Sequence, residues 1–435
     1  MYSSNVSSED VETCEVYDYD KTGGKFEGVR GRARRDGMYL DLIIRYDNII
    51  VDTTAVTPEN ANEPIDYVVA DPADVFDVID GDLDFAIEHL AYVEDFGRYN
   101  RSVARHLRGK SAMWQAGYLG GGAAKYQEAA DQFDKIINES GRNLVSISQV
   151  FGQDLNHSEM LFAITRDQDL GSTGAGDNLA GGAGTWIGSV FTQRLYEDSH
   201  GYFISEVENG GQALGWAHPN DYLQELYGTL VIPDPTKPWG RQIITDDLRY
   251  TNYFFPETYV ANNPTSPRFG EEIPVTDYDN NIRRYHFSSK KFYDEEKGEN
   301  TNDSWKDYPM YRLAETFLLG SEAHWRLGNN GKALEYINTV RRRAFGGDTS
   351  FDFTSYDLET YLEESARELN LERNRWFLLK RLGILVERQR LHYRFGANAS
   401  QVTTNEYPME EHMVRAPIPQ NQIDLMGTFP QNPGY

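Results

Sequence analysis

Three tryptophans lie in loop-like stretches that also carry amides, carboxylates or guanidinium groups. Trp186 follows a glycine-rich run, Trp216 lies in LGWAHPNDY, and Trp239 lies in TKPWGRQ. A flat indole can cover the apolar C–H face of a neutral, hydroxyl-rich molecule such as a sugar, while polar neighbours hydrogen-bond its hydroxyls. We therefore treat these tryptophans as candidate ligand-binding residues. The alternative, that each anchors its loop by packing, explains a single tryptophan equally well.

Tyr222 is the next candidate, because Asn220 and Asp221 precede it directly. The chain holds 28 tyrosines, and such a surplus indicates an amphipathic contact surface. The alternative for most of them is a place in the helical core and its loops.

The catalytic and cofactor-binding motifs are incomplete or missing in the sequence. Gly109, Lys110 and Ser111 imitate the end of a phosphate-binding loop, but Ala104 stands where its first glycine belongs. The sequence has no GxSxG nucleophile elbow and no pair of histidines four residues apart that would bind zinc. It therefore predicts no cofactor and no catalytic residue.

A calcium site has only a partial motif. Asp277, Asp279 and Asn281 imitate the opening of a calcium-binding loop, but Ile282 occupies the turn position that favours glycine. Asp80, Asp82 and Asp84 alternate in the same way inside an expected helix, where we expect them to face solvent. No metal site is predicted.

The net charge of −26 limits the classes of ligand and partner that the protein can bind. Phosphates would be repelled, so a nucleic acid or another polyanionic ligand is disfavoured, and a neutral ligand or a protein partner fits better. A single cysteine, Cys14, excludes an internal disulfide. No run of 18 apolar residues is present, so no membrane-spanning helix is expected.

The elements that must position these residues are helical hairpins. Residues 309–344 read as two amphipathic helices separated by a break at residues 328–331, with Gly320, Ala323 and Ala333 where the helices must approach closely. Residues 101–139 repeat this pattern, and Asp71 and Pro72 begin a helix within 72–93. The spacing resembles tetratricopeptide repeats, which stack to bury their apolar faces.

Between the two hairpins, residues 143–308 have an irregular texture. The stretch is rich in Gly, Pro, Asn and aromatic residues, apart from a strand-like segment, SEMLFAI. A long irregular insertion in a compact protein is more often functional than filler. After the second hairpin, residues 358–386 predict a further helix pair. In it, we expect Glu372 and Arg375 to form a local ion pair, and Arg341, Arg342 and Arg343 before it to be a solvated helix end.

Several segments together resemble the SusD/RagB family of outer-membrane nutrient-binding lipoproteins. They are RARRDGMYLDLIIRYDNI, HSEMLFAI, RLAETFLLGSEAHWRLGNNGKALEYINTVRRRA, ESARELNLERNRWFLLKRLG and the ending RAPIPQNQI…FPQNPGY. They follow one another from about residue 28 to the end of the chain. The signal peptide, the anchoring cysteine and the first helices of the family are not found, so the chain looks like an N-terminally incomplete member.

The resemblance implies a mainly α, single SusD-like domain in which tetratricopeptide-like hairpins form a curved scaffold. We expect a helical part over 1–142, an irregular ligand-binding lobe over 143–308, helical hairpins over 309–395 and an extended tail over 396–435. The family often places part of its aromatic surface in the loop before the first clear helix, which adds Tyr17 and Tyr19 to the candidate ligand-binding residues.

The resemblance also implies a function. It predicts a non-catalytic protein on the surface of the outer membrane, held by a lipid anchor, that captures oligosaccharides and delivers them to a SusC-like TonB-dependent transporter. Two alternatives stay open. A helical glycoside hydrolase or lyase would need two carboxylates across a cleft, and a protein-interaction scaffold would bind no saccharide.

Overall fold

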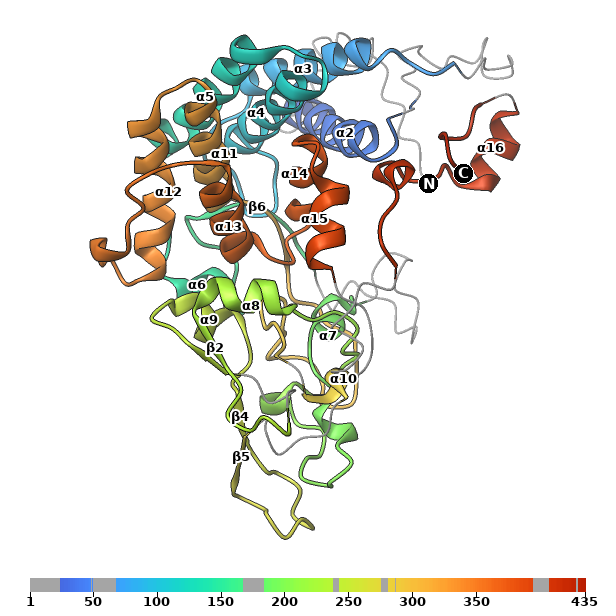
Figure 1. Ribbon diagram of the computed structural model, residues 1–435. Coiled ribbons are helices and arrows are strands. Elements are labelled where there is room, and N and C mark those ends of the chain that lie inside the picture. The colour runs from blue at the N-terminus through green and yellow to red at the C-terminus, as the bar shows by residue number, and fades with distance from the viewer. Residues whose placement is uncertain are drawn as a thin grey trace.

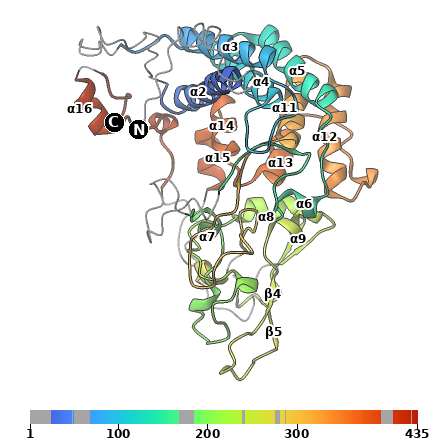
Figure 2. The same cartoon turned by 180° about the vertical axis from the view of Figure 1, so that it is seen from behind.

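The computed structural model describes residues 24–47, 49, 68–166, 184–237, 242–274, 281–285, 287–393, 407–427 and 429–435. In these residues, helices form an arch, and a lobe of loops and short strands tapers away from its underside (Figures 1 and 2). The arch is built from the early and late parts of the chain, and the lobe from the middle. The fold is mainly α, as predicted.

Three helical hairpins make up most of the arch. α2 (Gly24–Tyr46) packs on α3 (Pro72–His89), α4 (Arg101–Tyr118) on α5 (Gly122–Glu139), and α11 (Leu313–Arg326) on α12 (Asn330–Ala344). The predicted hairpins at 101–139 and 309–344 are confirmed. So is the predicted start of α3, where the Asp71 side chain accepts a hydrogen bond from the Ala73 backbone N–H at 2.8 Å.

Phe133 of α5 lies where α5 meets two other helices. A methyl group on Gly109 of α4 would come within 2.5 Å of the Phe133 ring, and one on Gly320 of α11 within 3.4 Å of its Cβ atom. The Gly320 methyl group would also lie 3.1 Å from the ring of Tyr336 on α12. The predicted close approach at Gly320 is therefore confirmed. Gly109 lets α4 and α5 pack closely within one hairpin, and Gly320 brings α11 of the second half of the chain against α5 of the first.

Gly109→Ala is expected to lower the free energy of unfolding by up to about 2 kcal/mol. Overpacking against Phe133 costs about 1–3 kcal/mol, and the better helix propensity of alanine offsets about 1 kcal/mol of it. Urea denaturation followed by circular dichroism measures the change. Gly81→Ala is the matched control, because no atom lies within 4 Å of a methyl group there, and it is expected to be neutral or stabilising. Equal stability of the two variants would contradict the packing role of Gly109.

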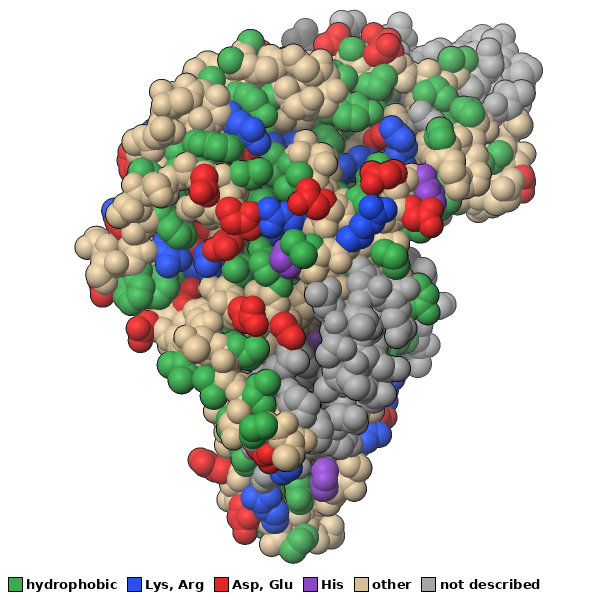
Figure 3. Space-filling model, in the orientation of Figure 1, with side chains coloured by type: hydrophobic (Ala, Val, Ile, Leu, Met, Phe, Trp, Pro, Cys, Tyr) green, Lys and Arg blue, Asp and Glu red, His purple; other side chains and the backbone are tan. Residues whose placement is uncertain are grey.

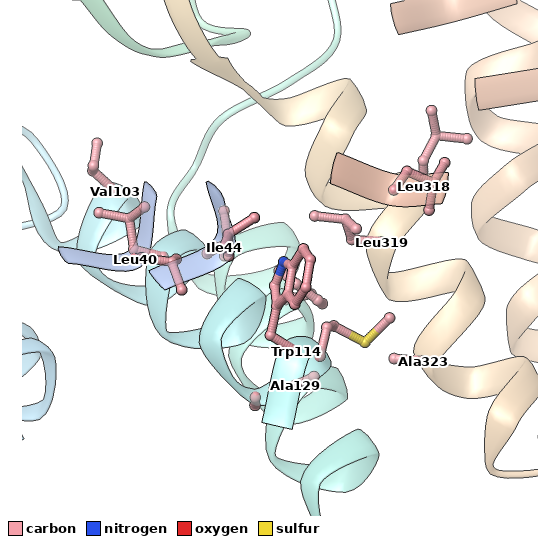
Figure 4. Packing of buried hydrophobic residues seen from close by; sticks show 14 of the residues in the cluster. Leu40, Ile44, Val103, Trp114, Ala129, Leu318, Leu319 and Ala323 are labelled. Carbon is pink, nitrogen blue, oxygen red and sulfur yellow. The ribbon is translucent and has the colours of Figure 1, made fainter. Parts of the chain in front are cut away.

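The hydrophobic core runs along the inside of the arch. Trp114 of α4 is 5% exposed and packs among buried residues of α2, α5 and α11. Figure 4 shows its indole between Ile44 of α2 and Leu319 of α11. Helices that are distant in sequence thus share one core, which a single hairpin could not provide.

The structure tests two expectations about polar residues of α3 and α4. Gly109, Lys110 and Ser111 lie inside α4 rather than in a phosphate-binding loop. The expectation that Asp80 faces solvent is wrong, because it is 8% exposed and accepts hydrogen bonds from Ser111 at 2.6 Å and Gln115 at 2.8 Å. Helical spacing could not reveal these partners, because they belong to the neighbouring helix.

The described part of the lobe contains three small antiparallel sheets. β1 (Met160–Ile164) pairs with β6 (Tyr308–Arg312), β2 (Thr229–Val231) with β3 (Gln242–Ile244), and β4 (Thr258–Val260) with β5 (Glu272–Pro274). The first sheet confirms the predicted strand and closes the base of the lobe. Short helices precede or connect the strands: α6 (Ile147–Val150) before β1, and α7 (Ile187–Val190), α8 (Asp221–Tyr227), α9 (Leu248–Tyr253) and α10 (Ile282–Tyr285) between strands.

The prediction of a helix pair over 358–386 is wrong in the number of helices. It consists of three helices, α13 (Leu358–Leu369), α14 (Asn374–Arg381) and α15 (Leu385–His392). Gly383, at φ 72°, divides the second predicted helix. The tail holds α16 (Gln420–Met426), and 3-10 turns lie at Leu195–Glu197, Val207–Asn209, Thr349–Phe351 and Glu411–Val414. Among the described helices, none is both long and apolar enough to cross a membrane.

Candidate functional site

A cavity of about 460 Å³ lies between α4, α11, α13, α14, α15 and the segment that enters α8. We name it the scaffold cavity. Its wall is mainly aromatic and aliphatic, with Trp114, Leu318, Tyr361 and Trp376 among the lining residues. A cavity of this size and character fits a neutral small ligand with apolar faces.

The charged groups of this wall are mostly paired. Lys110 donates a hydrogen bond to Glu315 at 2.8 Å, and His106 lies 3.1 Å from the other Glu315 oxygen. Burial by itself would raise the pKa of Glu315, but Lys110 and His106 lower it to about 2. Glu315 is therefore ionised at neutral pH and already held by two neighbours. Of the described residues that line the scaffold cavity, Glu315 alone is a carboxylate.

Tyr222 lines the scaffold cavity, as does His392 of α15. Their rings stack with centroids 3.7 Å apart and planes 26° apart. Asn220 fixes this arrangement, because its amide donates to the His392 carbonyl at 2.7 Å and its side-chain oxygen accepts from the Leu223 backbone N–H at 3.0 Å, which caps α8. Burial raises the pKa of Tyr222, so its hydroxyl stays protonated. The stacked ring is therefore held in place at the cavity wall.

Trp216 precedes this wall by a few residues and is 59% exposed. Its backbone is fixed, since its N–H donates to the Val190 carbonyl at 2.9 Å. The preceding Leu214 carbonyl accepts a hydrogen bond from Arg283 at 3.0 Å, and Gly215 adopts φ 54° where a Cβ atom would strike the Arg283 carbonyl. A large aromatic face is thus presented to solvent on a rigid loop.

Trp186 has a different environment. It begins α7, the short helix whose Val190 also holds Trp216, but its indole N–H donates to Asp303 at 2.9 Å in a partly buried position. Its polar edge is used within the protein. The structure therefore brings the backbones of Trp186 and Trp216 to one helix but leaves only Trp216 widely exposed.

The other sequence candidates, Trp239, Tyr17 and Tyr19, lie outside the described residues, as do Asp277 and Asp279 of the calcium-like motif. The side chain of Asn281 accepts a hydrogen bond from the Arg283 backbone N–H at 3.0 Å. Within the described part of the chain, no group of three His, Cys, Asp or Glu residues could hold a metal ion.

A buried network of charges lies behind the cavity and joins the arch to the lobe. Glu368 of α13, fully buried, accepts hydrogen bonds from Arg312 of β6 at 2.7 Å and Arg249 of α9 at 3.1 Å, and also from Arg343 of α12. Burial would raise the pKa of Glu368, but the surrounding arginines lower it well below its usual value. These side chains come from four separate elements, so the network fixes their relative positions.

This network corrects two expectations. Arg343 is not at a solvated helix end, because its side chain is 8% exposed and pairs with Glu159 and Glu368. The expected Glu372–Arg375 pair is also wrong. Glu372 pairs with Lys291 at 2.8 Å, and Arg375 donates to the Leu362 carbonyl at 2.7 Å. A buried charge that has lost its water needs a charged or hydrogen-bonding partner, and here these partners come from distant segments of the chain.

Sequence reasoning missed the wall residues Trp114, Trp376 and His392 as parts of a site. The first two follow a helical apolar period, which predicts core rather than cavity. The one usable signal was the cluster of aromatic and cationic residues late in the chain.

The chain resembles known proteins over most of its length. The SusD family model matches residues 232–435. A SusD-like protein P25 from Formosa agariphila is 26% identical over 389 residues, which is 83% of this chain and 64% of the relative. The chain therefore spans less than two thirds of the length of this curated relative.

Solved structures share the fold. A SusD superfamily protein from Parabacteroides distasonis is 18% identical with a TM-score of 0.71, over 98% of this chain and 82% of that one. A SusD homolog from Bacteroides thetaiotaomicron is 20% identical with a TM-score of 0.70 over the same shares. Surface glycan-binding protein A from that organism, solved in complex with laminarihexaose, is 19% identical with a TM-score of 0.65, over 94% of this chain and 78% of that one. The chain is therefore similar to SusD family proteins over residues 232–435, and it shares the fold of the solved SusD superfamily structures.

Proposed function

We propose that this protein is a non-catalytic oligosaccharide-binding protein of the outer-membrane surface that delivers its ligand to a SusC-like TonB-dependent transporter. In this proposal the lobe over 143–308 carries the ligand surface, and a lipid anchor holds the protein at the membrane. Trp216 and Tyr222 contact the saccharide, with Trp239, Tyr17 and Tyr19 as further contacts.

The observation that carries the proposal is the exposed indole of Trp216 on its fixed loop. An indole held on a fixed backbone beside polar residues can stack on the apolar face of a sugar ring while its neighbours bond the hydroxyls. The stacked Tyr222 and His392 add aromatic faces at the wall of the scaffold cavity. The laminarihexaose complex of one family member supports a saccharide as the ligand.

The two alternatives have less support. Hydrolysis or elimination needs a pair of carboxylates, whereas the described wall of the scaffold cavity offers Glu315 already paired with Lys110. A pure protein-interaction scaffold would bind no saccharide, whereas a protein of similar fold has been solved with laminarihexaose.

Trp216→Ala is expected to lower the affinity for the cognate oligosaccharide at least tenfold, about 1.4 kcal/mol, because the stacking face is lost. Titration calorimetry against a panel of neutral plant, microbial and host glycans measures the change, and Trp216→Tyr should retain part of the affinity. The matched control is Phe269→Ala, an aromatic side chain that is 58% exposed elsewhere on the lobe, and it should bind like the parent.

Three results would contradict the proposal. They are the absence of heat with every glycan, equal binding by Trp216→Ala and the parent, and new reducing ends after incubation with a glycan. The first would favour the interaction scaffold, and the last would favour the hydrolase.

A further inference from the structure

A second cavity, of about 470 Å³, lies between α2, β1, β6 and the turn that enters α14. We name it the basic cavity, because Arg30, Arg34, Arg98, Lys110 and Arg373 line it against two carboxylates, those of Asp41 and Glu372. This balance is unexpected in a chain of net charge −26. The chain-wide charge predicts repulsion of polyanions, but exposed charges are screened within about 8 Å at physiological salt. Local arginines therefore decide what enters this cavity.

Two of these cations have no carboxylate partner among the residues that the structure describes. Arg30 pairs with Glu94, and Lys110 with Glu315. Arg34, one turn after Arg30 on α2, is exposed and makes no ion pair in the described part of the chain. Arg373 lies over the Tyr308 ring, 5.0 Å from its centroid. The Arg34 guanidinium is therefore available to an anion, and that of Arg373, which also hydrogen-bonds the Tyr308 side chain, keeps further N–H donors for one.

The position of Arg373 is built into the fold. Both carboxylate oxygens of Glu372 are held by Arg312, at 2.6 and 2.8 Å, as part of the buried network. The neighbouring residues Leu371 and Arg373 take left-handed conformations, at φ 66° and 67°. Such conformations cost about 1–3 kcal/mol for non-glycine residues and gather at functional sites. The strained turn places the Arg373 side chain at the cavity wall.

The cavity also offers aromatic faces and room. Tyr99 and Phe162 lie together at its wall with ring centroids 4.7 Å apart, beside Tyr311. Gly37 of α2 opens the space, because a methyl group there would lie 3.4 Å from the Tyr99 hydroxyl and 4.0 Å from that of Tyr311. Arginine forks with aromatic rings are the groups that recognise a sugar ring bearing an oxyanion.

We propose that the basic cavity binds an anionic sugar unit, with Arg34 and Arg373 on its oxyanion and Tyr99, Phe162 and Tyr311 along its ring. The oxyanion is a carboxylate, as in a uronic acid, or a sulfate ester. This inference rests on the proposed function in that it takes the ligand to be a saccharide. It adds a second site with its own charge requirement.

Titration calorimetry with short saccharides tests the proposal, because a disaccharide does not reach two separate sites. The probes are digalacturonate and dimannuronate, each beside its carboxyl-reduced neutral counterpart, and a sulfated galactobiose. At least one anionic probe is expected to bind at least tenfold more tightly than its neutral counterpart, with affinity that falls between 50 and 500 mM NaCl. Preference for a uronide or for the sulfated sugar identifies the oxyanion.

Four variants assign the binding to this cavity. Arg34→Gln and Arg373→Asn are each expected to weaken anionic binding about tenfold, and asparagine keeps the left-handed backbone accessible. Lys332→Gln removes one positive charge from α12, outside the cavity, and should bind like the parent. Gly37→Leu fills the cavity and should abolish binding, whereas Gly81→Leu, an exposed helix glycine with no atom within 4 Å of a Cβ position, should not.

Circular dichroism confirms that each variant is folded. The proposal is overturned if no anionic probe binds, if neutral counterparts bind equally well, or if the arginine variants keep parental affinity. Loss of neutral-glycan binding in Trp216→Ala with no anionic binding would leave the proposed function in place and reject the basic cavity alone.

Discussion

Glu368→Gln is expected to lower the free energy of unfolding by about 3–5 kcal/mol. The substitution keeps the side-chain volume but removes the one negative charge that contacts Arg249, Arg312 and Arg343 together, at a position with no solvent exposure. Three guanidinium groups would then repel one another with less compensation. Breaking a buried ion pair is costly because the remaining charge stays desolvated.

Guanidinium chloride denaturation, followed by tryptophan fluorescence and by circular dichroism, measures this loss. Glu335→Gln is the control, since Glu335 forms an exposed pair with Lys332 at 3.2 Å, and exposed pairs contribute about 0–1 kcal/mol. A loss below about 1 kcal/mol in Glu368→Gln would mean that the network does not hold the arch and the lobe together. Non-coincident transitions of the two probes would indicate that the lobe separates before the arch unfolds.

The stability of the protein is expected to rise by about 2–3 kcal/mol between pH 7.5 and pH 9. Burial lowers the pKa of Lys291, Lys297 and Lys306 to about 8, from an ordinary value of 10.5. Between these two values the unfolded chain binds more protons than the folded chain, so raising the pH favours the folded state. Each lysine contributes about 1 kcal/mol over this interval. Above about pH 10 the trend reverses, because burial raises the pKa of Tyr227 and Tyr253 and only the unfolded chain then loses their protons.

Urea denaturation at intervals of half a pH unit measures this dependence. Lys306 is the best single probe, because its amine donates to the Phe151 carbonyl at 3.0 Å and the Tyr293 carbonyl at 2.7 Å. Lys306→Met cannot titrate, so its stability should rise about one third less steeply than that of the parent. A flat or falling parental curve from pH 7.5 to pH 9 would show that the buried amines keep their ordinary pKa.

The hairpins could be predicted because their signals are local. Helical periodicity, the cap at Asp71 and the break after Arg326 depend on residues within a few positions of one another, and the folded chain keeps them. The charged residues of the same helices were predicted wrongly for the converse reason. Arg343 and Asp80 have partners on other elements, and spacing along one helix says nothing about what packs across from it.

The residues of the candidate sites also divide into those that local sequence signals could predict and those whose role depends on distant parts of the chain. Trp216 and Tyr222 could be proposed from their polar neighbours in the sequence, but Trp186 could not be told apart from them. Its partner Asp303 lies far along the chain. The two cavities lay beyond sequence reasoning, because each is formed where several helices and strands converge. Nothing in the run of Arg30 and Arg34 indicates that Arg373 would meet them at one wall.

The pairing of β1 with β6 has a consequence for how the chain folds. Residues 160–164 can pair with residues 308–312 only after the whole lobe between them has been synthesised. The same holds for the packing of α5 on α11. Closing so long a loop carries an entropic cost that local contacts do not repay, so structures of this kind acquire their long-range pairings slowly. During synthesis, the first two hairpins would emerge with the face meant for α11 still uncovered. That uncovered face makes the nascent first half a natural client for chaperones until the second half arrives.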